Sequence, residues 1–235
     1  MRRMRQKRRM DAVKDKAQEI REVAEETARS EALVAKLIEA LGAGSRRERQ
    51  HAARIVAQVG KIKIEALAPY VNELVDALNR PEAQTRWEVL DALTSLVHLE
   101  SRSCDKAIAG AETALFDEDS GPLRLAAMRF LCTLGATTEN RSEKVWPFID
   151  EAIQCYHGDL EFSDMLTAVT DFSNGKLSDT VKEQLAARMK FDAENSKNAC
   201  SNGPGALCAM RLWANSPEGA ERDQYLADAK KIYNW

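Results

Sequence analysis

The sequence predicts an all-α fold, arranged as a right-handed superhelix of about five stacked helix pairs. One apolar template recurs along the chain at intervals of 37, 38, 38 and 41 residues. Turn-forming residues fall between the two helices of successive pairs, and no alternating apolar and polar segment typical of a β-strand competes with them. A repeat at this interval is typical of stacked helical arrays.

The template begins at Arg49, Arg86, Arg124, Phe162 and Gly203, with apolar residues three, four, seven and ten positions later. These offsets form one stripe on a helix of about 3.6 residues per turn, so each window predicts a second helix with one buried face. The stripes are Ala52, Ala53, Val56 and Val59; Val89, Leu90, Leu93 and Leu96; Ala127, Met128, Leu131 and Leu134; Met165, Leu166, Val169 and Phe172; Ala206, Leu207, Met210 and Trp213.

Another apolar stripe precedes each window and predicts the first helix of the pair. Examples are Leu37, Ile38 and Leu41; Val71, Leu74 and Leu78; Ile108, Ala111 and Leu115; Trp146, Ile149 and Ile153; Val181, Leu185 and Met189. Ser45 is placed to cap the second helix of the first pair, and Pro81 and Pro122 suit the first turn of the next two second helices. Each repeat is therefore expected to be helix, turn, helix.

These features resemble the HEAT repeat family over roughly residues 31–215. The resemblance rests on Pro69 and Pro147 early in the first helices, an acidic turn, and Arg49, Arg86 and Arg124 opening the second helices. The fourth and fifth windows depart from the family, because Phe162 and Gly203 stand where the arginine would be. The resemblance implies an α-solenoid that presents a surface for binding rather than enclosing a pocket.

Composition favours an ordinary folded protein with no cofactor. Hydrophobic residues make up 44% and charged residues 30% of the 235 residues. No segment is long and apolar enough to span a membrane, and no signal peptide follows the basic start, so the expected compartment is the cytoplasm. The cysteines are odd in number and scattered, and the histidines lie in different repeats, so we expect neither a disulfide framework nor a metal site.

The two ends of the chain differ from the array between them. Residues 1–30 are predicted to form a basic, charged helix, and six of the first ten residues are Lys or Arg. Residues 1–54 hold 15 Lys and Arg against 9 Asp and Glu, whereas the rest of the chain holds 19 against 28. The basic start permits weak nucleic-acid binding, but the acidic remainder argues against a large nucleic-acid surface. Residues 216–235 are predicted to form a helix that caps the array.

The expected binding residues lie one and five positions after the start of each window. In stacked arrays the second helices line a concave wall, and these positions face outward from the buried stripe. We expect Gln50, Arg54, Trp87, Asp91 and Arg129 to contact a protein or peptide partner, with Trp87 and Arg129 as anchors because Trp and Arg contribute strongly at interfaces. The leading hypothesis is a noncatalytic scaffold or adaptor.

An enzyme from a different class is the alternative hypothesis. The segment Trp87-Glu88-Val89-Leu90-Asp91 resembles the Trp-Asp motif of HEAT-like DNA alkylation repair glycosylases. The resemblance implies that Asp91 stabilises positive charge on a sugar, that Trp87 packs against the damaged base, and that Arg124 assists. No second tryptophan stands near Thr167, where another aromatic wall would be sought.

Overall fold

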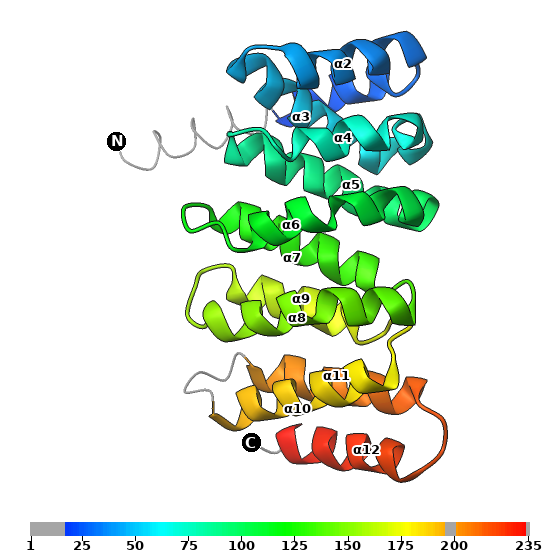
Figure 1. The fold of residues 1–235 in the computed structure, drawn as a ribbon, viewed down its shortest axis with the longest axis vertical. Helices are drawn as coiled ribbons and strands as arrows, with labels where there is room; N and C mark the ends of the chain where they lie inside the picture. Colours follow the sequence, from blue (N-terminus) through cyan, green and yellow to red (C-terminus); the bar gives the residue numbers. More distant parts are fainter. Residues whose placement is uncertain (1–16, 196–200, 234–235) are drawn as a thin grey trace. The chain divides into compact units, whose positions relative to one another are not determined.

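The computed structural model describes residues 17–195 and 201–233 (Figure 1). Its secondary-structure elements are all helices, joined by turns, and these residues contain no strand. The chain separates into two compact units, Met1–Lys106 and Ala107–Trp235, which we call the N-terminal and C-terminal units. The predicted all-α fold is confirmed. The boundary between the units falls inside the predicted array of residues 31–215.

The N-terminal unit contains a leading helix and two helix pairs. Residues 17–27 are helical, and the elements that follow are α2 (Glu31–Ala43), α3 (Arg46–Ile62), η1 (Ile64–Ala66), η2 (Ala68–Tyr70), α4 (Val71–Ala77) and α5 (Ala83–Cys104). Helix α2 packs on α3, α4 packs on α5, and the second helices α3 and α5 pack on each other. Glu100 has non-helical dihedral angles, so the regular part of α5 ends there.

The C-terminal unit contains three helix pairs and a final helix. After η3 (Asp105–Ala107), its elements are α6 (Ile108–Leu115), α7 (Gly121–Gly135), α8 (Glu139–Cys155), α9 (Phe162–Phe172), α10 (Asp179–Asn195), α11 (Asn202–Asn215) and α12 (Ala220–Tyr233). The second helices α7, α9 and α11 pack in succession, as do the first helices α6, α8 and α10. The two units together therefore give the five predicted pairs.

The predicted stripes form the buried core in the first four pairs. Every template residue of α3, α5, α7 and α9 is buried, from Ala52 in the first window to Phe172 in the fourth. Gly135 ends the stripe of α7, and a methyl group there would come within 2.4 Å of Val145 and 2.9 Å of Phe172. Glycine at this position thus allows α7 to approach α8 and α9 closely.

The fifth stripe was predicted one residue out of register. Leu207 and Met210 are 42% and 51% exposed, whereas Gly205, Ala206, Cys208, Ala209 and Leu212 are buried. The window therefore starts at Asn202 rather than Gly203. The physical reason is the close approach of α11 to α10, since a methyl group on Gly205 would lie only 3.1 Å from the Met189 carbonyl oxygen. Small residues face this contact, whereas the side chains of Leu207 and Met210 are exposed.

Three local expectations concern caps and prolines. Ser45 caps α3 in a capping box with Glu48, as predicted. Pro122 lies in the first turn of α7, but Pro81 precedes the cap residue Glu82 and lies outside α5. Pro147 lies in the middle of α8 rather than near its start, because α8 begins at Glu139.

The ends of the chain were predicted as a basic helix and a cap. Residues 1–10, with the basic run, lie outside the described residues. Helix α12 packs on α10 and α11 through Tyr225, Ala229 and Ile232, all buried. Its role as a cap for the array stays a prediction. No helix among the described residues has the length and apolar character that a membrane span requires.

Candidate functional site

An arginine links the two second helices of the N-terminal unit. Arg49, the fourth residue of α3, donates from Nε to Glu82 at 3.2 Å and from Nη1 to the Gly44 carbonyl at 2.7 Å. Glu82 is the N-cap residue of α5, and only 4% of its side chain is exposed. The hydrogen bonds from Arg49 are the main cause that lowers the pKa of Glu82. We call Arg49, Gly44 and Glu82 the Arg49 rung.

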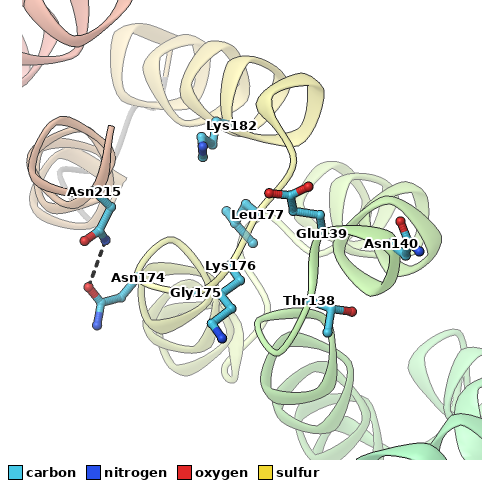
Figure 2. A pocket seen from close by; sticks show the side chains of 9 residues that line it. All are labelled: Thr138, Glu139, Asn140, Asn174, Gly175, Lys176, Leu177, Lys182 and Asn215. Atoms are coloured by element: carbon cyan, nitrogen blue, oxygen red, sulfur yellow. Dashed lines mark hydrogen bonds between the residues drawn. The ribbon is translucent and has the colours of Figure 1, made fainter. Parts of the chain in front are cut away.

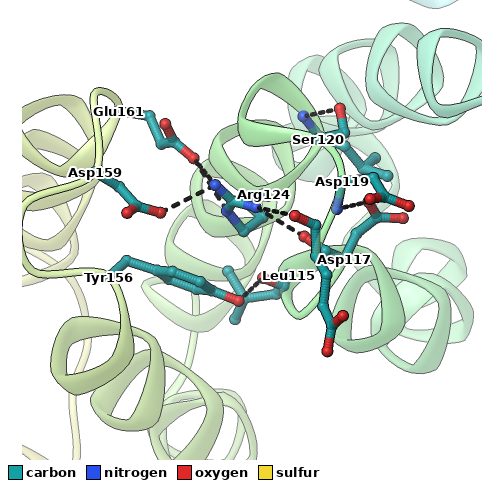
Figure 3. A network of polar contacts seen from close by, with 10 residues as sticks. Leu115, Asp117, Asp119, Ser120, Arg124, Tyr156, Asp159 and Glu161 are labelled. Carbon is teal, nitrogen blue, oxygen red and sulfur yellow. Dashed lines mark hydrogen bonds and ion pairs between the residues drawn. The ribbon is translucent and has the colours of Figure 1, made fainter.

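The same position carries an arginine in the C-terminal unit (Figure 3). Arg124 is the fourth residue of α7, and its Nε donates to Glu161, the N-cap residue of α9, at 3.0 Å. Nη2 also donates to Asp159 at 3.0 Å, and the guanidinium lies 4.8 Å from the centre of the Tyr156 ring. Arg124, Asp159 and Glu161 form the Arg124 rung. A third arginine, Arg86, holds the same position in α5.

The rungs tie one second helix to the start of the next, because Arg49 and Arg124 are both held against the N-cap glutamate of the following second helix. Sequence reasoning missed both glutamates. They lie 33 and 37 residues after their arginines, and only exact helix starts would have marked them as N-cap residues.

In the N-terminal unit four predicted binding residues lie on the second helices. Gln50 and Arg54 are on α3, and Trp87 and Asp91 are on α5; Arg54 is exposed and the other three are partly exposed. With its amide oxygen turned towards Arg54, Gln84 accepts a hydrogen bond from Arg54 Nη2 at 2.8 Å. We define the Trp87 face as the outward side chains of these two helices: Gln50, Arg54, Gln84, Trp87, Glu88 and Asp91.

A hollow of about 640 Å³ adjoins this face. Its lining residues come from three helices: Ala17, Gln18, Ile20 and Arg21 from the leading helix, Arg54 and Gln58 from α3, and Glu88 from α5. Burial raises the pKa of Glu88, and the negative charge of Asp91 adds to this effect. Hydrogen bonding to Trp87 acts in the opposite direction. The hollow therefore combines aliphatic, carboxamide and charged groups of both signs.

In the C-terminal unit the outward residues of the second helices are mostly polar. Arg129 on α7 is exposed and lies 4.0 Å from Asp164 on α9, an exposed pair at the limit of ion-pair distance. Ser163 and Thr167 on α9 are also exposed. Surface pairs of this kind contribute little to stability.

A second hollow, of about 630 Å³, lies in the C-terminal unit where loops between successive pairs meet (Figure 2). Asn174 follows α9 and Asn215 ends α11, and Asn215 donates to Asn174 at 3.1 Å. The Lys176 N–H donates to the Ala136 carbonyl at 2.8 Å, and Gly175 permits this approach because a methyl group there would lie 2.5 Å from Ala136. These hydrogen bonds join the segment after α9 to the segment after α7 and to the end of α11.

The residues considered for metal binding and redox chemistry do not assemble into a site. Within residues 17–195 and 201–233, no group of three His, Cys, Asp or Glu side chains is placed to hold a metal ion. Cys132 and Cys208 are free and buried, and burial raises the pKa of Cys208 to about 11. Thiols of this kind react poorly, since the thiolate is the nucleophile.

The three residues of the glycosylase alternative have different surroundings. Trp87 and Asp91 share the Trp87 face, whereas Arg124 belongs to the other unit and its guanidinium is taken up by the Arg124 rung and the carbonyls of Asp117 and Glu118. The described residues offer no observation that favours a catalytic role for Asp91.

Comparison with known proteins identifies the fold. No protein-family model matches the sequence, and no curated protein matches it. A designed armadillo repeat protein superposes with a TM-score of 0.64 and 12% identity, covering 85% of this chain and 99% of that one. Another designed armadillo repeat protein, in complex with the peptide (KR)4, superposes with a TM-score of 0.58 and 13% identity, covering 92% of this chain and 91% of that one. A structure of computationally designed armadillo repeat proteins for modular peptide recognition superposes with a TM-score of 0.56 and 13% identity, covering 92% of each chain.

These similarities show the fold alone, which is a helical repeat solenoid of the armadillo-like kind. The narrower assignment to HEAT repeats stays a prediction.

Proposed function

We propose that the protein is a noncatalytic scaffold that binds a peptide segment of a protein partner on the outward faces of its second helices. The observation that carries the proposal is the Trp87 face, where a partly exposed indole stands among polar side chains beside a hollow of about 640 Å³. We propose further that residues 31–215 act as one HEAT-like array and that α12 caps it.

The chemistry of the Trp87 face suits an extended polypeptide. Gln50 and Gln84 carry carboxamides, which donate and accept hydrogen bonds at once and so match the N–H and C=O groups of a main chain. Trp87 offers a large apolar surface with one N–H donor, the type of residue that dominates binding energy when a partner covers it.

The rigid mounting of this face also supports the proposal. The Arg49 rung joins α3 to α5 through a nearly fully buried carboxylate, so the side chains of the two helices keep their spacing without a partner. A preformed surface loses less conformational entropy on binding than a flexible one. Two of the structurally similar proteins are themselves described as a peptide complex and as designs for peptide recognition.

Selection from a random peptide display library tests the proposal. We expect the wild-type protein to select peptides, and Trp87→Ala to weaken their binding by about 30-fold, the effect of losing about 2 kcal/mol at an interface hot spot. Leu99→Ala is the matched control, because Leu99 is an exposed apolar residue on the same helix. Failure to select any peptide, or equal binding by Trp87→Ala, contradicts the proposal.

A further inference from the structure

The turn between α8 and α9, residues 156–161, is bonded to the preceding helix pair on one side. The Tyr156 hydroxyl donates to the Leu115 carbonyl at 2.9 Å, and Asp159 accepts from Arg124 at 3.0 Å (Figure 3). Arginine and the carbonyl oxygen keep their charge state across the physiological pH range. This side of the turn is therefore insensitive to moderate changes in pH.

On its other side the same turn faces the next helix pair through a histidine. His157 Nε2 lies 3.6 Å from Asp192 Oδ1, and the imidazole packs against Phe162 with ring centres 4.6 Å apart. Asp192 lies near the end of α10 and is only 3% exposed. Its second oxygen, Oδ2, has no hydrogen-bond partner within the described part of the chain.

Besides His157, the charge of Arg188, one turn earlier in α10, also favours the Asp192 carboxylate. Arg188 itself donates to Asp150 of α8 at 2.6 Å, and Asp150 is a like charge that disfavours the Asp192 carboxylate. Further charged groups on or against α10 are paired elsewhere: Lys190 with Asp228, Lys231 with Glu194, and Arg211 with Asp171. Burial is the main cause that raises the pKa of Asp192, and the charges of His157 and then Arg188 oppose it.

We propose that His157 and Asp192 form a pH-sensitive latch that holds the end of α10 to the α8–α9 turn while the imidazole is protonated and releases it as the pH rises. Histidine is the side chain whose charge ordinarily changes between about pH 5 and 8. Above this range the buried Asp192 carboxylate loses its imidazolium partner and keeps only the charge of Arg188, which is bonded to Asp150, and a buried charge that is poorly paired is costly.

The sign of the Asp192 contribution agrees with this direction. A carboxyl whose pKa is raised on folding stabilises the folded state most at low pH, and that stabilisation is lost as the pH rises through the folded-state pKa. The Asp192 contribution therefore has the same sign as the proposed latch, which is closed at lower pH and opens as the pH rises.

Hydrogen–deuterium exchange of the full chain tests the latch at about pH 6 and about pH 8.5, with rates corrected for the chemical dependence of exchange on pH. In the wild-type protein we expect about tenfold less protection at the higher pH in residues 187–195 and 156–161. Asp192→Asn removes the buried charge and should give equal protection at both values. His157→Gln should give the lower protection at both.

His98→Gln is the matched control, because His98 is an exposed histidine of the N-terminal unit, and it should behave as wild type. His157→Gln changes an exposed side chain and keeps the test decisive even if Asp192→Asn does not fold. The latch is refuted by a wild-type protein without pH dependence in these segments, or by either variant that retains the wild-type tenfold change.

Discussion

The Arg49 and Arg124 rungs place the same residue at the same helical position but surround it differently. Arg49 has one acidic partner, Glu82, whose side chain is 4% exposed. Arg124 has two, and 13% of Glu161 and 40% of Asp159 are exposed. In the N-terminal unit the arginine thus pairs with one buried carboxylate. In the C-terminal unit it pairs with two carboxylates that are more exposed to solvent. The difference implies that loss of the arginine has unequal consequences in the two units.

The largest effect is expected from Arg49→Ala. It leaves the Glu82 carboxylate buried without its partner, which costs about 3 kcal/mol of unfolding free energy. Urea unfolding followed by far-ultraviolet circular dichroism measures this loss. Adding Glu82→Gln should restore about 2 kcal/mol because the stranded charge is gone. No recovery in the double variant would show that the arginine acts through packing alone.

A smaller effect is expected from Arg124→Ala, about 2 kcal/mol, because Glu161 and Asp159 regain water more readily than Glu82. The same urea unfolding followed by circular dichroism measures this loss. Here Lys is an informative replacement, since it keeps the charge but loses the fork that reaches Glu161 and the Asp117 carbonyl together. A loss for Arg124→Ala larger than that for Arg49→Ala would reverse the ranking of the two rungs.

The fifth helix pair, which has no rung arginine, should show the smallest effect. Leu207→Ala is expected to change the unfolding free energy by less than about 0.5 kcal/mol, because the side chain is exposed. Leu212→Ala in the same helix should cost about 3 kcal/mol, because Leu212 is buried in the core. Thermal or urea unfolding compares the two variants directly. A loss for Leu207→Ala as large as that for Leu212→Ala would contradict the observed register of α11.

Much of the fold could be predicted from the sequence, because the apolar pattern is most regular in the three windows that begin with an arginine. The windows at Arg49, Arg86 and Arg124 combine a polar start with a regular apolar stripe, and only one helical register buries all four positions. The register predicted from Gly203 was wrong because Leu207 and Met210 are more hydrophobic than Gly205 and Cys208, so a hydrophobic pattern places them on the buried face. Close helix packing selects small residues instead, and a stripe of small residues is nearly invisible in a hydropathy pattern.

Part of the candidate surface could also be predicted from the position of the buried stripe. Trp87 and Arg54 follow from their offset from the buried stripe, and the structure places both at least partly in solvent. The hollow of about 640 Å³ that Glu88 lines could not be predicted, because part of its lining comes from the leading helix at residues 17–27, which lies far from Glu88 in sequence. The His157 and Asp192 contact joins residues 35 positions apart across two turns, and no local pattern marks it.

A footprint of the bound peptide on the protein tests the central claim most directly. With a library-selected peptide at saturation, hydrogen–deuterium exchange should slow in α3 and in residues 83–95 of α5, and exchange in the first helices α2 and α4 should not change. Slowed exchange confined to α2 and α4, or no change in α3 and α5, would contradict binding on the second-helix face.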